Sequence, residues 1–364
     1  MKKSIWIRMI VAAACILAGL ACIAVGHGLG GHKIFTEGAR NDHDLVTNTF
    51  IPQETFDRIS VDIIAANLRI LPAEDGTCSV VTWDREEMVY GVTVTEGVLT
   101  LTVTDTRKWY ENLFTAYRSN PTVTVRLPAD TYTSLYAKTS SGRIEVDGAF
   151  TFREDVTLDV SSGAVVMAAS VEGHTRVEAT SGSVRLSGKA GELTARNGSG
   201  SLTADGLTVA GAATVSSTSG RVEMENAAVG SLSVNVGSGS MKLEDLTVTD
   251  SLTVGTISGG LHLSRVTCGS LAMETTSGGI DLTDTAVTTH LQAKTTSGAI
   301  RFTRADAATL DLKTTSGSVS GSLLTPKIFY TDTTSGSGDV PKSTEGGLCE
   351  IRTTSGSIRI TIGE

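Results

Sequence analysis

A Ser-Gly pair recurs at twelve regularly spaced positions between residues 141 and 356, and this repeat constrains the fold more than any other feature of the chain. Consecutive glycines are 18 to 21 residues apart, with a mean spacing of about 19.5 residues. The flanking residues repeat as well, as in LQAKTTSGAIRF and CEIRTTSGSIRI. A fixed period of this length indicates a stack of similar units, each of which packs against its neighbours.

Apolar residues occupy fixed positions around each glycine, namely seven and five residues before it and two and four residues after it. Around Gly278 these residues are Leu271, Met273, Ile280 and Leu282. Polar residues stand between them, which is the period-two pattern of a half-buried strand. Each copy is therefore expected to form a strand, a Ser-Gly corner, a second strand and about eight residues that lead back.

These copies predict an all-β fold, a parallel β-solenoid of about twelve regular coils of 19–20 residues over residues 134–364. The corner glycine is expected because a sharp turn commonly needs a positive φ. The neighbouring Ser and Thr hydroxyls are expected to bond the turn backbone or the next coil. Leucine-rich and helical repeats are excluded, because the Asn or Cys ladder of the former and the 3.6-residue period of the latter are absent.

Residues 50–133 are related to the repeat but irregular, and we interpret them as an N-terminal cap with the first coils. Within this segment, residues 107–119 gather aromatic and aliphatic side chains on what would be one face of a helix. A plug for the open end of the solenoid is one interpretation of this helix. Contact with a membrane or a partner is the other.

The N-terminus has the pattern of a membrane anchor. Lys2, Lys3 and Arg8 precede an uncharged run from Met9 to Gly31. Its most apolar part, Met9 to Gly26, would form a helix ~27 Å long, near the hydrocarbon thickness of a bilayer, and we assign the anchor to residues 5–26. Residues 1–31 are therefore predicted to be a single-pass anchor in the cell membrane, with the N-terminus cytoplasmic and the C-terminal part extracytoplasmic. A cleaved signal sequence or a lipid-modified Cys22 would export the chain as well. Residues 32–49, which are polar, are expected to be a tether.

Charge and cysteine content exclude several classes of protein. The chain has 30 basic and 39 acidic residues, a net charge of -9, and no Lys/Arg stripe, so nucleic-acid binding is not expected. Its five cysteines are scattered and lack metal-ligand spacing. We therefore expect no cofactor and no bound metal. No G-x-S-x-G elbow with plausible partners is present, which leaves nucleophilic catalysis without support.

Two sets of outward-facing residues are candidates for ligand contact. His262, Asp281 and Arg301 stand three residues past successive glycines and should stack on consecutive coils. The whole column mixes both charges, however, which is also typical of a solvated face. The second set is a ladder of Thr pairs whose hydroxyls could contact glycans, and it includes Thr276, Thr296 and Thr315. Its other interpretation is hydrogen bonding between coils.

The segment TVTVRLPADTYTSLYAKTSSGRIEV (122–146) and the T-T-S-G copies that follow it resemble a bacterial "putative adhesin" family of unknown function, DUF4097-like and described as a toast-rack β-solenoid. The resemblance covers about residues 50–364. It implies a membrane-tethered envelope protein, often placed with surface adhesion or envelope-stress systems, without an established set of catalytic residues. One departure is Gly338, which replaces the apolar residue two past the corner.

The sequence thus favours a non-enzymatic, membrane-anchored solenoid whose partners are the membrane and envelope proteins or surface glycans. Two alternatives are a carbohydrate-active β-helix enzyme, which needs a tight group of carboxylates, and an accessory component of envelope-stress signalling. The last coil in the sequence carries Glu350, Arg352 and Arg359, charges that are expected to discourage pairing at the exposed edge of the solenoid.

Overall fold

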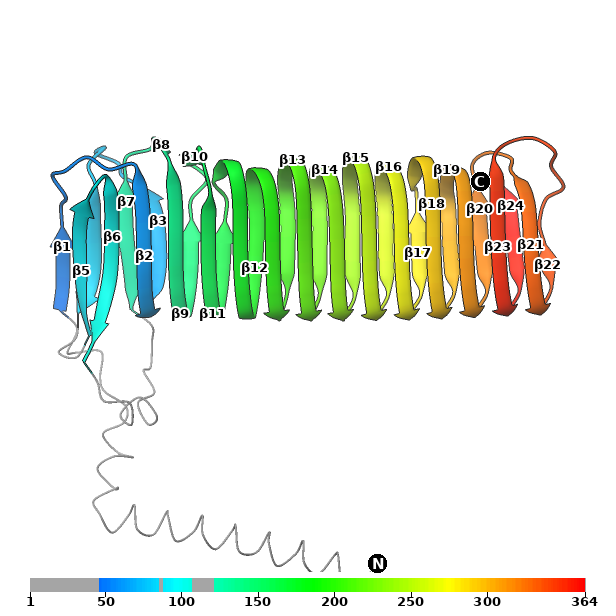
Figure 1. Cartoon of the computed structure of the whole chain (residues 1–364), viewed down its shortest axis with the longest axis horizontal. Coiled ribbons are helices and arrows are strands. Elements are labelled where there is room, and N and C mark those ends of the chain that lie inside the picture. The colour runs from blue at the N-terminus through cyan, green and yellow to red at the C-terminus, as the bar shows by residue number, and fades with distance from the viewer. Residues whose placement is uncertain (1–45, 85–87, 107–120, 364) are drawn as a thin grey trace, which may run out of the picture. The chain divides into compact units, whose positions relative to one another are not determined.

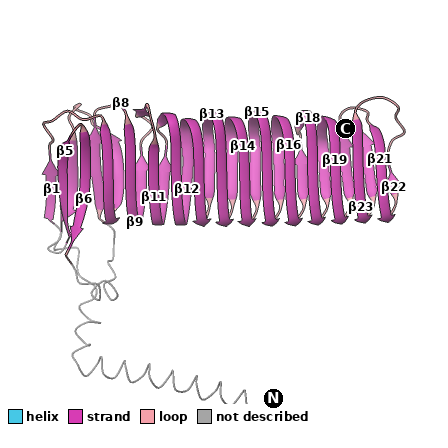
Figure 2. Ribbon diagram, in the orientation of Figure 1, coloured by secondary structure: helices cyan, strands magenta, loops and turns pink. Residues whose placement is uncertain are grey.

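The computed structural model describes residues 46–84, 88–106 and 121–363, and every regular element among them is a strand (Figure 2). Three predictions fall outside the described residues: the anchor over residues 5–26, the part of the tether over 32–45, and the helix over 107–119. Among the residues described, no helix is long and apolar enough to span a membrane. Contacts divide the chain into two units, of which the larger comprises Thr47–Trp83, Tyr90–Val103 and Pro121–Glu364.

This larger unit is a parallel β-solenoid of about eleven turns (Figure 1), so the predicted fold class is confirmed and the expected twelve regular coils are a slight overcount. At its N-terminal end are β1 (Val46–Phe50), β2 (Arg58–Ala65), β3 (Asn67–Pro72), β4 (Ser79–Asp84), β5 (Met88–Thr95), β6 (Val98–Asp105), β7 (Thr122–Leu127), β8 (Thr131–Tyr132) and β10 (Thr151–Phe152). The coils that follow are built from β9 (Ser134–Val146), β11 (Val156–Met167), β12 (Ser170–Ser199), β13 (Leu202–Ser219), β14 (Val222–Ser238), β15 (Met241–Ser258), β16 (Leu261–Ser277), β17 (Ile280–Thr283), β18 (Ala286–Ser297), β19 (Ile300–Ser316), β20 (Val319–Leu323), β21 (Ile328–Ser335), β22 (Gly338–Asp339), β23 (Leu348–Ser355) and β24 (Ile358–Ile362).

The apolar columns predicted from the sequence line the core. Ile280 and Ile300 are register partners on neighbouring coils, and both are fully buried. Leu271 and Leu291 are paired and buried in the same way before the corner. Because equivalent side chains stack directly on one another, each coil shares its apolar side with the next, and the buried residues form one continuous cluster.

The eight residues that were expected only to lead back also form strand and contribute to the core. In β16, Val266 and Cys268 are buried and pair with Leu246 and Val248 of β15. Register shifts follow this segment, for example between Cys268 and Leu271. The shifts absorb the variation in repeat length, which leaves the register at the Ser-Gly corner constant.

The corner glycines are required mainly because neighbouring coils approach closely. A Cβ on Gly163 would lie 1.8 Å from the carbonyl oxygen of Gly142, and one on Gly298 would lie 1.9 Å from that of Gly278. Gly163 has a φ of 148°, whereas Gly298 has a φ outside the left-handed region. The expected positive φ therefore explains only some corners, and the stacking of one backbone on the next explains the rest.

In five consecutive coils a second corner lies six residues past the Ser-Gly glycine, at positions 226, 245, 265, 284 and 304, and uses a residue other than glycine in the left-handed conformation. Asp245, Arg265, Asp284 and Arg304 there have φ values between 49° and 54°. The Arg265 guanidinium binds the Asp245 carboxylate at 2.6 and 2.8 Å, and the Arg304 guanidinium binds the Asp284 carboxylate at 2.6 and 2.7 Å. These bidentate ion pairs connect adjacent coils at a corner where the backbone has the left-handed conformation, which L residues rarely adopt.

At the C-terminal end, the order of the coils in space differs from their order in the sequence. β23 pairs with β19 on one side and with β21 on the other, so that Cys349 lies between Leu310 and Phe329. β24 lies between β20 and β22 in the same way. The last segment of the chain is thus inserted into the stack, and β21 and β22 form the outermost coil (Figure 1).

This insertion explains the glycine at 338, because among the described residues no coil lies beyond β22 to share an apolar side chain there. It also shows that the expected protection of the edge is wrong. Glu350, Arg352 and Arg359 belong to the inserted coil and do not lie on the terminal edge. The connection into β21 is held by Lys327, which is 4% exposed and forms an ion pair with Asp306 at 2.7 Å.

The N-terminal end has a similar inversion of order. Within β2, Arg58 pairs with Ser134 of β9 and with Val98 of β6, so β2 lies between two strands that both follow it in the sequence. β3 lies between β7 and β9. β4 pairs with β7 antiparallel.

Candidate functional site

The structure brings His262, Asp281 and Arg301 together, as their column position indicates. Register pairs place Asp281 between the other two. Its carboxylate is 3.2 Å from Nδ1 of His262 and 3.7 Å from Nη1 of Arg301. All three side chains are substantially solvated, so each pairing contributes about 0–1 kcal/mol. The three side chains form an ion ladder on the surface, in which the Asp281 carboxylate lies between the His262 imidazole and the Arg301 guanidinium.

The two residues of a Thr pair differ in burial. Thr276, Thr296 and Thr315, the second residue of each pair, are exposed as expected. The first residues Thr275, Thr295 and Thr314 are buried, so these three do not face a ligand, and the interpretation of hydrogen bonding between coils applies to part of the ladder. The buried Thr295 hydroxyl donates to the carbonyl oxygen of Gly278 at 3.1 Å, and that of Thr314 donates to Gly298 at 3.0 Å. These hydroxyls bond one coil to the next at the corner.

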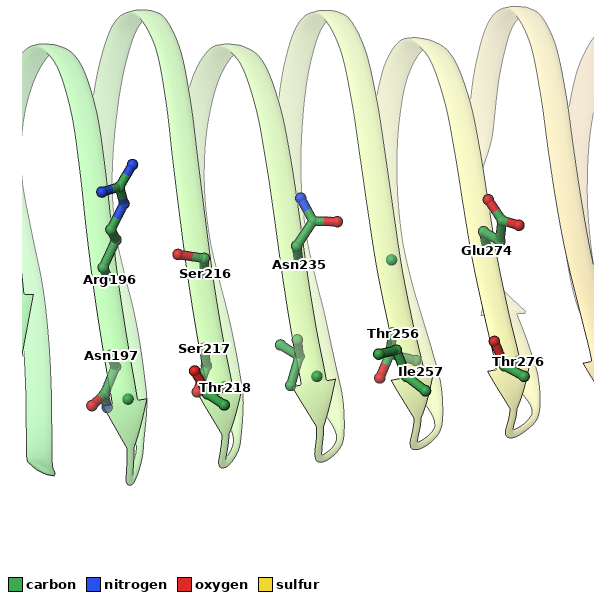
Figure 3. Close-up of a pocket in the computed structure, with 14 residues that line it drawn as sticks. Arg196, Asn197, Ser216, Ser217, Thr218, Asn235, Thr256, Ile257, Glu274 and Thr276 are labelled. Carbon is green, nitrogen blue, oxygen red and sulfur yellow. The ribbon is translucent and has the colours of Figure 1, made fainter. Parts of the chain in front are cut away.

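A shallow groove of about 670 Å³ lies on the face that carries the Thr ladder, where it crosses β12 to β16 (Figure 3). It is lined by Arg196, Asn197, Gly198, Ser216, Ser217, Thr218, Asn235, Val236, Gly237, Gly255, Thr256, Ile257, Glu274 and Thr276. Of the predicted candidates, only Thr276 lines it. Thr296 and Thr315 continue the same column beyond the groove.

The groove is hollow because several of the residues that line it are glycines, which have no side chain. In the column that contains Thr276, glycine alternates with larger residues, in the order Gly198, Thr218, Gly237, Ile257. A Cβ on Gly198 or Gly237 would meet a backbone carbonyl oxygen of the preceding coil at 2.4 or 2.6 Å. The close stacking of the coils therefore excludes larger residues at these two glycines.

The neighbouring outward column runs from Arg196 through Asn235 and Gly255 to Glu274. At Gly255 the nearest obstacle to a Cβ is the side-chain oxygen of Asn235, at 2.7 Å. Since that side chain can rotate, this position has room that its neighbours lack. Sequence reasoning missed the groove, although the break in the Thr column at 198, 237 and 257 was visible in the aligned copies.

The groove combines hydrogen-bonding groups with one large apolar side chain. Ile257 is 66% exposed at a position where the later repeats carry Thr. The Asn235 amide, the Thr218 and Thr276 hydroxyls and the Arg196 guanidinium line the groove on the other coils (Figure 3). Ligand sites typically combine apolar contact area with a few polar groups that fix orientation, and this lining fits a ligand with both kinds of surface.

Beneath the rim, Asn197 keeps the hydrogen bond that Thr295 and Thr314 make, because its Nδ2 donates to the carbonyl oxygen of Gly182 at 3.1 Å, whereas Ser217, Thr256 and Thr275 lose it. The Oδ1 of Asn197 and the hydroxyls of Ser217, Thr256 and Thr275 are buried without a hydrogen-bond partner among the described residues. At Ser217, Thr256 and Thr275 the coils therefore lack the side-chain hydrogen bond that Thr295 and Thr314 provide on the C-terminal side of the groove.

The groove has little capacity for acid–base or metal chemistry. Glu274 is the only carboxylate among the described residues that line it. Across the described part of the chain, no group of three His, Cys, Asp or Glu side chains could hold a metal ion. Burial raises the pKa of the Cys268 thiol to about 11 and that of Cys349 to about 12, which makes both thiols poor nucleophiles at neutral pH.

Comparisons with known proteins give the family of this chain. No curated protein matches it. Among solved structures, a "putative adhesin" from Parabacteroides merdae is similar at 16% identity, with 76% of this chain and 96% of that chain covered and a TM-score of 0.35. A "putative lipid binding protein" from Parabacteroides distasonis is similar at 14% identity, with 87% and 97% covered and a TM-score of 0.30.

The family model described as Toastrack DUF4097 matches residues 56–192 and again residues 187–361. Together the two matches span nearly the whole solenoid, including the N-terminal coils and the inserted C-terminal segment. The resemblance seen in the T-T-S-G copies is thereby confirmed, and the chain belongs to the Toastrack DUF4097 family.

Proposed function

We propose that this chain is a non-catalytic binding scaffold of the bacterial cell surface, anchored in the membrane through residues 5–26, whose lateral groove contacts surface glycans. The observation that carries the proposal is the groove over β12 to β16. Its amide and hydroxyl groups suit the hydroxyls of a sugar, and Ile257 offers an apolar contact for the C–H face of a sugar ring. Because the groove crosses successive coils, an extended chain fits it better than a compact ligand.

The lining of the groove supports a role without catalysis. Glycoside hydrolysis usually requires two carboxylic acids on opposite sides of the scissile bond. The groove supplies Glu274 alone among its described residues, and Asp281 lies outside the lining, engaged by His262 and Arg301.

Glycan binding is tested by titrating the detergent-solubilised full chain with a panel of neutral and charged cell-surface polysaccharides. The informative variant is Gly255→Trp, which fills the groove at the position with room for a side chain. Thr247→Trp is the matched control, because Thr247 is exposed on the same strand, β15, but does not line the groove. We expect Gly255→Trp to abolish binding and Thr247→Trp to leave it unchanged. Absence of binding across the panel, or an equal loss in both variants, contradicts the proposal.

The same panel tests for catalysis. We expect no polysaccharide to be shortened by the wild-type chain. Cleavage by the wild type that disappears in Asp281→Ala would assign the ion ladder a catalytic role and replace the proposal with that of a carbohydrate-active enzyme.

A further inference from the structure

The outermost C-terminal coil presents a free strand edge. β21 takes its backbone hydrogen bonds from β23, and among the described residues no strand is in register with its other side. The inner coils have a neighbour on both sides. The outward-directed N–H and C=O groups of the eight residues Ile328–Ser335 can therefore form backbone hydrogen bonds with a strand of another chain.

The side chains beside this edge are apolar where the preceding coils are polar. Ile328 is 44% exposed, Tyr330 is 54% exposed, and Leu348, the register partner of Ile328, is 49% exposed. In the three preceding copies of the repeat, the column of Ile328 and Leu348 holds Ser270, His290 and Thr309. The change from polar to apolar residues is confined to the two coils nearest the edge.

The edge lacks the devices by which proteins usually prevent strand pairing. β21 contains no proline and no lysine, and Asp332 is its only charged residue. Its register with β23 continues without a bulge from Ile328 to Thr333. Exposed edges of soluble proteins are normally interrupted by such features, so an uninterrupted one indicates a surface that pairs.

We propose that β21 pairs antiparallel with β21 of a second copy of this chain. Two identical edges can be related by a two-fold axis, which is the commonest symmetry of homodimers. Because the apolar residues lie at the start of β21, we place this axis near Tyr330, where it brings the Tyr330 side chains of the two copies together. Pairing at this edge extends the sheet along the axis of the solenoid. The two solenoids are therefore joined end to end, with their N-terminal strands β1 to β7 at the far ends of the pair (Figure 1).

The size of the contact sets the expected strength of the dimer. One strand of eight residues, with two half-exposed apolar side chains of its own and Leu348 of the neighbouring strand, offers less than the ~800 Å² per partner of a standard interface. We therefore expect a dimer that dissociates on dilution. If both chains are anchored as in the proposed function, such a dimer would join chains that project from two facing membranes. Only this last point depends on the anchor.

Analytical ultracentrifugation of the detergent-solubilised full chain over a range of concentrations tests the pairing. We expect Tyr330→Lys to weaken dimerisation by about tenfold or more, because the two-fold axis brings like charges close together at the edge. Tyr136→Lys is the matched control, since Tyr136 occupies the same column in the first regular coil and is also exposed. Its dimerisation should equal that of the wild type. A wild type that stays monomeric, or two variants that behave alike, overturns the proposal.

Hydrogen exchange of the unmodified chain gives a second test that does not depend on any variant. The β21 amides that face away from β23 should be protected at high protein concentration and should exchange rapidly after dilution. The amides of β23, which is paired on both sides, should be protected in both cases. Equal exchange of the β21 amides at both concentrations contradicts the pairing.

Discussion

At the scale of single residues, the fold depends on where backbone from two coils comes into contact. The corner glycines are the clearest case, because each Cα faces the carbonyl oxygen of the glycine one coil away. The Thr residue three positions earlier adds a side-chain hydrogen bond to that carbonyl in the coils of Thr295 and Thr314. The repeated T-T-S-G letters therefore have a structural role at the first Thr and at the Gly, and the second Thr is left on the surface.

A pair of glycine variants tests this account. Gly298→Ala should destabilise the protein by about 1–3 kcal/mol or more, because its Cβ would lie 1.9 Å from the Gly278 carbonyl oxygen and the coils would have to separate. Gly279→Ala is the control, since the nearest atom to its Cβ is 3.6 Å away. The control should stay within about 0.5 kcal/mol of the wild type in denaturant unfolding. Equal effects of the two variants would show that the approach of the coils does not select glycine.

The buried cysteines predict a loss of stability at alkaline pH. Burial raises the pKa of the Cys349 thiol from 9.0 to about 12, so the folded chain keeps this proton in a range where the unfolded chain releases it. The resulting contribution to stability is complete below pH 9 and is lost as the pH rises toward 12. In Cys349→Ala the free energy of unfolding should fall less steeply over this window.

The control for this measurement is Ile351→Val, which removes apolar volume from the same buried strand without removing a titrating group. Its pH dependence should match that of the wild type. If Cys349→Ala also keeps the wild-type slope, the thiol does not contribute to the alkaline transition.

At the scale of elements, the burial of inward-facing residues accounts for the inverted order of the last two coils. The segment that contains β23 and β24 supplies Cys349, Ile351, Ile358 and Ile360 to the core, and all four are buried. At the corresponding positions the segment with β21 and β22 has Phe329, Thr331, Gly338 and Val340. Placing the more apolar segment between two coils covers it on both sides, and the more polar segment forms the end of the solenoid.

Two aspartate substitutions in one column test this inverted order. Ile351→Asp should cost about 4 kcal/mol or more, because Ile351 lies between two coils and the carboxylate would be buried without a partner. Thr331→Asp, at the equivalent position of β21, should change the free energy of unfolding by about 0.5 kcal/mol or less, because Thr331 is exposed. If the coils followed one another in sequence order, Thr331→Asp would be the variant placed between two coils.

At the scale of the whole molecule, residues 1–31 carry the prediction about cellular location. We expect the full chain to sediment with membranes and to resist extraction by alkaline carbonate, with its solenoid accessible to protease added outside the cell membrane. A chain that lacks residues 1–31 should be recovered in the soluble fraction. Recovery of the full chain from the cytosol would contradict the anchor, and a mature N-terminus just after Gly26 would establish cleavage instead.

The period of the coil, the strand before and after each Ser-Gly corner and most of the inward-facing residues could be predicted from the amino-acid pattern alone. These features follow from local alternation, which each copy of the repeat shows independently. The stacking of His262, Asp281 and Arg301 followed from the same alignment, because residues in one column of a regular solenoid lie on adjacent coils.

The pattern could not predict which coil lies beside which at the two ends, how Gly198, Gly237 and Gly255 combine into a groove, or which edge has no partner strand among the described residues. These features depend on contacts between segments that the repeat treats as equivalent. The alignment of copies assigns a residue to a column, whereas its burial also depends on whether another coil covers it, as the contrast between Ile351 and Thr331 shows.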